Sequence, residues 1–189
     1  DGPFDKFWRM SKIEQAGLIW DALFLQHSPI SEACRGVLTT LRALGLDVKK
    51  RDLPALRKWF AGWKVEDYIT RCMELGGVRN ICMTNSPFDD QERPVWERGF
   101  PRDERFTAAL RMDPLLLAWP ESASRLKRWG YKVSPDLSPR TISEVRRFLG
   151  DWTKRIRAKY LMVSVGAEFA FPDKGFCAQL IEKAILPHG

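Results

Sequence analysis

Three short apolar runs mark the second half of the chain, and each ends in polar or acidic residues before a stretch of helical character. The runs span residues 78–84, 106–112 and 160–167. Strand, helix and strand in succession are typical of parallel β/α construction. Nearly continuous apolar runs are expected of parallel strands, because both faces of such a sheet are usually covered. We therefore predict that the three runs lie side by side in one parallel sheet.

Helical patterns separate and follow these runs. We expect helices at residues 91–98, 122–129, 138–157 and 174–185. Ser138 or Thr141 can cap the long one at 138–157, since a serine or threonine hydroxyl accepts a hydrogen bond from an exposed backbone N–H of the first turn.

The first 76 residues show helical periodicity and no strand pattern. Expected helices cover residues 11–26, 31–44, a segment after Asp52, and 65–75. Ser11 and Glu14 form a capping box, and Ser31 and Asp52 are N-cap residues. The apolar stripe expected to face the core on the first of these helices is Ile13, Leu18, Ile19, Ala22 and Leu23. The sequence thus predicts a helical region, 1–76, and a β/α region, 77–189.

Acidic residues and one arginine stand where the apolar runs end. Asp89 and Asp90 follow the first run, Arg111 and Asp113 the end of the second, and Glu168 the third. Ligands of parallel β/α folds bind at the carboxyl ends of the strands. These side chains are therefore the candidates for chemistry: carboxylates to move protons or hold hydroxyl groups, and an arginine to grip a carboxylate with two parallel hydrogen bonds.

Each candidate also has a purely structural interpretation. One of Asp89 and Asp90 can cap the following helix while the other is solvated. Arg111 and Asp113 can form an ion pair across the strand end, and Glu168 can be an ordinary loop carboxylate. The sequence leaves both interpretations open.

Composition limits the choice of fold and partner. The chain has 189 residues, and 44% of them are apolar. It can bury a core, but a complete eight-stranded β/α barrel typically needs about 250 residues. Lysine and arginine outnumber aspartate and glutamate by 31 to 24, with a net charge of +7. The basic residues are dispersed among acids, so nucleic acid is not the expected partner; the densest basic cluster lies in the helix at 146–159.

Several classes of protein are disfavoured by what the sequence lacks. It has no glycine-rich phosphate loop, HExxH, GxSxG or CxxC motif, which disfavours dinucleotide enzymes, P-loop enzymes, zincins and serine hydrolases. Its two histidines, His27 and His188, are far apart, which argues against a histidine-rich metal site. Unpaired cysteines, the lack of a signal peptide and the lack of a long apolar run lead us to expect a cytoplasmic protein without a membrane span.

Two segments resemble a known family. MTNSPFDD (Met83 to Asp90), followed about twenty residues later by AALRMDPLL (Ala108 to Leu116), resembles the uronate isomerase branch of the amidohydrolase superfamily. Residues 31–47 resemble the helical excursion that precedes this strand in that group. The chain departs from the family pattern at Asn85 and Ser86, where the family has acids, and at Met112, where it has proline.

The resemblance implies a partial TIM-type (β/α) barrel that depends on a divalent metal, with zinc as the expected ion in the complete protein. The family binds its metal through a His-x-His pair, a further histidine and an aspartate; none of these motifs is present, so no metal ligand is assigned in this chain. What the resemblance carries over is Arg111 for the substrate carboxylate and Asp113 beside it, with Thr84 and Asp89 as weaker candidates. Asp113 and Asp89 are thus the candidate catalytic residues, and Arg111, Thr84 and Glu168 the candidate substrate-binding residues.

Two functions follow as expectations. The first is a segment of an enzyme, a uronate isomerase or an amidohydrolase-type hydrolase, that acts on a sugar acid or another small carboxylate. Its sheet is expected to be completed by segments outside this sequence or by another copy of the chain, because about three strands cannot close a barrel. The alternative is a non-catalytic binding module whose basic helix at 146–159 contacts nucleic acid or an acidic protein partner.

Overall fold

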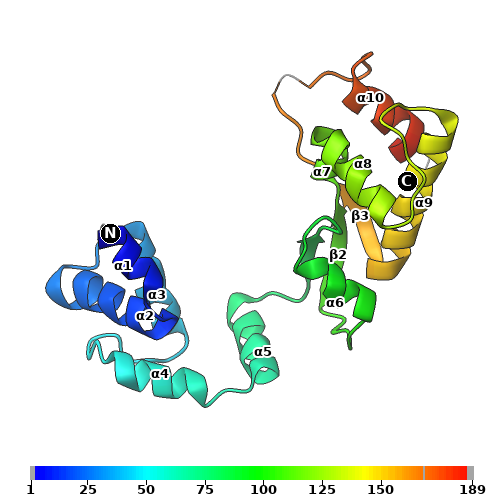
Figure 1. Ribbon diagram of the computed structural model, residues 1–189. Coiled ribbons are helices and arrows are strands. Elements are labelled where there is room, and N and C mark those ends of the chain that lie inside the picture. The colour runs from blue at the N-terminus through cyan, green and yellow to red at the C-terminus, as the bar shows by residue number, and fades with distance from the viewer. Residues whose placement is uncertain (1–2, 168, 187–189) are drawn as a thin grey trace. The chain divides into compact units, whose positions relative to one another are not determined.

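The computed structural model describes residues 3–167 and 169–186. The chain divides into two compact units, Asp1–Arg79 and Asn80–Gly189, which are described separately. The first unit contains helices and the second combines helices with a parallel sheet (Figure 1). No described helix is both long enough and apolar enough to cross a membrane.

The first unit is helical, as predicted. Its elements are α1 (Pro3–Arg9), α2 (Lys12–Trp20), the π-helix η1 (Asp21–Gln26), α3 (Glu32–Ala43), α4 (Leu53–Ala61) and α5 (Val65–Gly76). The expected caps are present: the Ser11 hydroxyl accepts from the Glu14 N–H, and the Glu14 carboxylate accepts from the Ser11 N–H at 2.8 Å. Ser31 and Asp52 cap α3 and α4 in the same way.

The core of this unit is small and differs from the predicted stripe. Its buried residues are Trp20, Phe24, Cys34, Leu41 and Leu56. Trp20 stacks on Phe24 with ring centroids 4.4 Å apart, and its indole N–H donates to the Arg51 carbonyl. The predicted stripe at 13, 18, 19 and 23 is wrong, because these side chains are 44–69% exposed. The two large aromatic rings occupy the core instead, since they bury more apolar area than the aliphatic side chains beside them.

The three predicted strands form one parallel sheet in the order β1-β2-β3, which confirms the central expectation. The strands are β1 (Ile81–Asn85), β2 (Phe106–Arg111) and β3 (Ala158–Met162). Thr84 lies beside Ala109 and Asn85 beside Leu110, and on the other side Leu110 pairs with Leu161. β2 is therefore the central strand, and β1 and β3 are its two edges.

Two of the predicted strand boundaries are wrong. Residues 78–80 precede β1, because Gly77 takes a left-handed conformation at φ 62° and the Val78 N–H donates back to the Met73 carbonyl of α5. The third strand ends at Met162 and not at residue 167. Beyond it the Ser164 N–H donates to the Asp113 carboxylate, so the chain leaves the sheet at this point.

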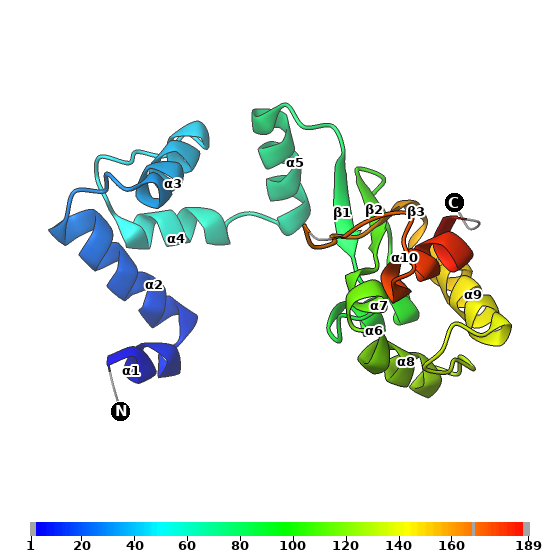
Figure 2. The same cartoon turned by 90° about the horizontal axis from the view of Figure 1, so that it is seen from above.

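Helices of the second unit lie beside the sheet. They are α6 (Glu92–Arg98), α7 (Asp113–Leu117), α8 (Trp119–Arg128), α9 (Pro139–Ile156), α10 (Phe176–Leu180) and the π-helix η2 (Ile181–Ile185). Of these, α9 packs on β2 and β3. Ser138 caps α9, as predicted. Figures 1 and 2 both show α8, α9 and α10 gathered next to one another. Their core includes the completely buried Leu110, Leu115, Leu126, Phe148 and Leu180.

The other face of the sheet is largely open. Side chains alternate along a strand, so the residues that do not point into the helical core point to the opposite face. That face carries Cys82, Thr84, Arg111 and Tyr160, all of them exposed. The small Ala109 between them is buried.

Candidate functional site

Arg111 and Asp113 form an ion pair at the carboxyl end of the central strand. Arg111 is the last residue of β2, and Asp113 is the first residue of α7. The Arg111 Nε donates to Asp113 Oδ2 at 2.6 Å, and the Ser164 N–H donates to Asp113 Oδ1 at 2.8 Å. The aspartate therefore ties together the ends of β2 and β3 and the start of α7. The ion pair between Arg111 and Asp113, which was the structural interpretation of these two residues, is therefore present.

The electrostatics of the pair favour a charged, well-held aspartate. Burial alone would raise the pKa of Asp113, but the hydrogen bonds from Arg111 and from the Ser164 N–H outweigh it, and the pKa lies below its usual value. The same hydrogen bond raises the pKa of Arg111. Because both carboxylate oxygens are engaged and the group resists protonation, Asp113 is better suited to positioning Arg111 than to moving a proton.

Arg111 remains accessible to a ligand. Its side chain is 44% exposed, against 15% for Asp113. An arginine held through Nε keeps its remaining N–H groups in a fixed orientation, which is the arrangement that grips a carboxylate. The pair thus combines a half-buried carboxylate anchor with an exposed cationic end.

Thr84 lies on the same face as Arg111. It is exposed and stands beside Ala109, two residues before Arg111 on the neighbouring strand. Its hydroxyl can donate to or accept from a sugar hydroxyl. The structure brings Thr84, Arg111 and Asp113 to the same end of the sheet; Glu168 lies outside the described residues.

Asp89 and Asp90 are occupied in local contacts. Asp89 Oδ1 accepts from the N–H groups of Gln91 and Glu92 at 2.8 and 2.9 Å, so it caps the start of α6. These backbone hydrogen bonds lower the pKa of Asp89. Asp90 forms an ion pair with Arg125 and is otherwise exposed. The capping interpretation therefore describes Asp89, while Asp90 has a partner that the sequence did not indicate.

The sequence interpretation missed the residue that shapes the turn after β1. Glu92 Oε2 accepts from the Asn85 side-chain amide at 3.1 Å and from the Ser86 N–H at 3.2 Å. The buried Asn85 and the half-buried Ser86 stand where the resembling family has acids, so an acid on the next helix takes the hydrogen bonds of this turn. An acidic residue in the first turn of a helix was the available signal.

The residues present do not fit a metal site. Among the residues that the structure describes, no group of three or more histidine, cysteine, aspartate or glutamate side chains lies close enough to hold a metal ion. The carboxylates at the strand ends are instead taken by Arg111, Arg125 and backbone N–H groups.

Several arginines of α9, the basic helix on which the alternative binding function rests, form contacts within the protein. Arg146 donates to the Lys183 carbonyl and Arg147 pairs with Glu144 at 2.7 Å. Arg155 donates to the Glu97 carbonyl. The contacts of Arg146 and Arg155 join α9 to its neighbours, the Arg147–Glu144 pair lies within α9, and all three leave fewer cations for a partner.

Comparison with solved structures places this geometry in context. The chain matches the crystal structure of a uronate isomerase from Bacillus halodurans C-125 with a TM-score of 0.91 and 46% sequence identity, over 100% of its own length. The chain is thus similar to this uronate isomerase in both sequence and structure. The chain spans 44% of the length of that isomerase. A scan with protein-family models finds no match, and a search of curated proteins finds none.

The match extends the resemblance seen in the sequence. The sequence motifs supported a likeness around residues 20–117, and the uronate isomerase structure matches the whole chain, including β3 and the helices after it. The likeness to uronate isomerases is thereby confirmed. Membership of the wider amidohydrolase superfamily stays a prediction.

Proposed function

We propose that this chain is a segment of an enzyme that isomerises a sugar acid. The observation that carries the proposal is the full-length match to a uronate isomerase at 46% identity. The exposed Arg111, fixed by Asp113 at the carboxyl end of β2, supports it from the geometry, because a sugar acid offers the carboxylate that an arginine recognises. Hydrolysis in the manner of an amidohydrolase has no comparable support.

The roles of this chain's residues follow from their contacts. Arg111 binds the carboxylate of the sugar acid. This contact fixes where the two carbons that exchange a proton lie in the site. Asp113 holds Arg111 in place and stays ionised. Thr84 hydrogen-bonds a sugar hydroxyl on the same face. In the isomerisation a base removes a proton from the carbon next to the carbonyl, and a proton is returned to the former carbonyl carbon.

The proton-moving base is proposed to lie outside the described carboxylates. Asp89 caps α6 through one carboxylate oxygen and Asp113 is held at both oxygens, so each carboxylate already has a structural role. Since no metal site fits the described residues, no step of this proposal runs through a metal. A divalent metal of the complete protein would be held by ligands beyond those described here.

We further propose that the sheet is part of a β/α barrel completed by strands outside this sequence. β1 and β3 each have one strand neighbour, and the face with Cys82, Thr84 and Tyr160 is open. Parallel sheets are normally covered on both faces. Further strands would cover this face and bring the remaining active-site groups opposite Arg111.

The test is isomerisation of a uronate by the polypeptide that carries this chain together with the remaining strands. Conversion between aldose and ketose forms of the sugar acid, lost on Arg111→Ala, supports the proposal. The matched control is Arg105→Ala, because Arg105 forms a similar pair with Asp103 (2.6 Å) just before β2, at the opposite end of the strand. A folded, complete polypeptide without uronate turnover would overturn the proposal.

A further inference from the structure

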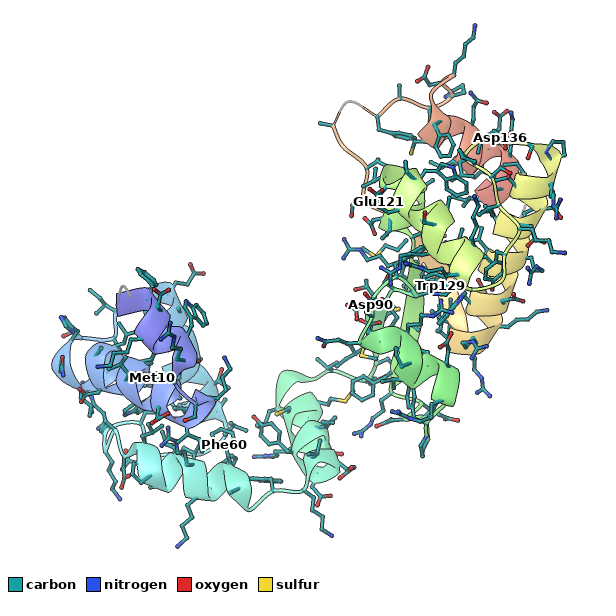
Figure 3. The ribbon with its side chains drawn as sticks, viewed as in Figure 1. Met10, Phe60, Asp90, Glu121, Trp129 and Asp136 are labelled. Atoms are coloured by element: carbon teal, nitrogen blue, oxygen red, sulfur yellow. The ribbon has the colours of Figure 1, made fainter. Side chains whose placement is uncertain are left out.

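A cavity separate from the Arg111 site opens in the helical layer. It has a volume of about 640 Å³ and lies between α6, α9 and the segment that follows α8. Arg93 and Glu97 line it from α6, and Trp152, Lys154 and Arg155 line it from α9. It shares no residue with the strand-end site. Trp129, labelled in Figure 3, also lines the cavity. Arg125 stands 5.2 Å from the Trp129 ring centroid and pairs with Asp90, which is labelled in the same figure.

Arg93 is held rigidly within this cavity. Its guanidinium carbon lies 3.6 Å from the ring centroid of Trp129 and 5.1 Å from that of Trp152. Its Nη2 pairs with Glu97 Oε1 at 2.5 Å. Two indole faces and one carboxylate fix the orientation of the planar cation, so its remaining donors point in set directions.

One end of this guanidinium lacks a partner. Nη1 of Arg93 is buried and has no hydrogen-bond acceptor among the described residues. Burial lowers the pKa of Arg93, against the opposing effect of Glu97. A buried donor without an acceptor is unfavourable, and in native proteins such groups usually meet water, an ion or a ligand.

Two further cations stand at the rim of the cavity. Lys154 and Arg155 are exposed neighbours near the end of α9, and neither forms an ion pair with an acidic side chain in the described part of the chain. Arg155 Nη1 donates to the Glu97 carbonyl at 3.4 Å, a contact that leaves the charge of the guanidinium unpaired with any acid. The two acids of the cavity each have a cationic partner: Glu97 pairs with Arg93, and Asp151 lies 3.9 Å from Arg147 Nη1 and also accepts from the Tyr131 hydroxyl at 2.9 Å. The free positive charge therefore exceeds the free negative charge.

We propose that this cavity binds a phosphate group. Arg93, Lys154 and Arg155 come from two helices and offer donors from different sides, which suits a phosphate dianion with three terminal oxygens better than a planar carboxylate with two. Both indole faces next to Arg93 are covered by guanidinium groups, so the cavity recognises the anion and not an aromatic ring attached to it. The phosphate can be free or the head of a small phosphate ester.

The test is a calorimetric titration of the complete polypeptide that carries this chain with inorganic phosphate and, separately, with glycerol 3-phosphate at constant ionic strength. The expected result is saturable binding that weakens about tenfold or more in Lys154→Gln/Arg155→Gln, because two charge-assisted contacts are lost. The control is Arg128→Gln/Arg140→Gln, which removes the same charge from exposed positions on α8 and α9 outside this cavity and is expected to change affinity less than about twofold.

The outcomes separate the alternatives. Tighter binding of glycerol 3-phosphate assigns the site to a phosphate ester, and tighter binding of inorganic phosphate assigns it to the free ion; both support the site. Equal weakening in the two double variants would show an adventitious ion only, attracted by net charge, and would overturn the proposal. No saturable binding of either probe to the unmodified chain would also overturn it. Arg93→Lys is a second variant that is expected to weaken binding, because lysine keeps the positive charge but lacks the paired N–H donors of the guanidinium.

Discussion

At the scale of single residues, Arg111 shows how one side chain can serve both the fold and a ligand. Its Nε is committed to Asp113 at 2.6 Å, while 44% of the side chain stays exposed. A contact with an internal partner therefore does not remove a residue from a functional site. It fixes the orientation that recognition of a carboxylate requires.

Arg111→Lys is expected to impair catalysis much more than folding. Lysine keeps the positive charge but cannot form two parallel hydrogen bonds to a carboxylate, so kcat/KM for a uronate should fall about tenfold or more in the complete enzyme. The change in the free energy of unfolding should stay below about 1 kcal/mol, because the ion pair is at the surface. Arg105→Lys, at the paired position near Asp103, should leave kcat/KM unchanged. Lower stability with unaltered kinetics would show that Arg111 is purely structural.

Asp113 is expected to make stability depend on pH on the acid side. Its pKa in the folded chain lies below the ordinary value for aspartate. The stabilisation is therefore fully present above the ordinary pKa, near 4, and is lost as the pH falls through the lower pKa of the folded state. Asp113→Asn should remove this component. Melting temperatures of both proteins from pH 7 to pH 2 measure it; parallel curves below pH 4 would contradict the assignment.

At the scale of secondary-structure elements, the sequence predicted those features that depend on residues close together in the chain, such as helix starts. The capping residues Ser11, Ser31, Asp52 and Ser138 each bond within their own first turn, so their position alone identified the helix starts. The end of β3 depends on Asp113, which is remote in sequence from Ser164. The Arg111–Asp113 pair was one of two interpretations that the sequence left open, whereas the Asp90–Arg125 pair needed the fold to be seen.

The long helix α9 is expected to depend strongly on Phe148. This side chain is completely buried, and its ring contacts Phe88, Trp129, Tyr131 and Trp152. Phe148→Ala should lower the free energy of unfolding of the β/α unit by about 3–5 kcal/mol, because a large cavity is left in a packed core.

Chemical denaturation followed by tryptophan fluorescence measures this loss. Phe4→Ala is the control, since Phe4 is 78% exposed and its removal should cost less than about 0.5 kcal/mol. A small effect at Phe148 would mean that the aromatic cluster is loosely packed.

At the scale of the whole molecule, the described sheet has two open edges and one open face. β1 is exposed at every position except Asn85, although its residues are mainly apolar. The chain matches a uronate isomerase over all its own length and spans 44% of that protein. Completion of the sheet by strands outside this sequence, or by another copy of the chain, stays a prediction made from the number of strands.

The isolated 189-residue chain is expected to self-associate. An apolar edge strand and an uncovered sheet face favour pairing with another copy when no further strands are present. Light scattering combined with size-exclusion chromatography should show species larger than the 21.8 kDa monomer. A monomer that melts cooperatively would show that the fold closes on itself and would rule out the barrel-segment proposal.

The same isolated chain is expected to retain no zinc. The described histidine, cysteine and acidic side chains form no cluster suited to a metal ion, and tight zinc binding needs three or four such ligands. Elemental analysis after dialysis is the measurement. About one equivalent of zinc per chain would reveal a ligand set that the described residues do not show.

The junction between α9 and β3 has a consequence for how the chain can change over evolution. α9 ends at Ile156, Arg157 turns the backbone in a left-handed conformation at φ 53°, and β3 begins at Ala158. Only one residue separates the helix from the strand, so there is no loop in which an added residue could be accommodated. One inserted residue would rotate Leu161 out of the core and Tyr160 into it, since neighbouring strand residues face opposite ways. This junction should therefore accept substitutions, glycine at 157 above all, while insertions and deletions are eliminated.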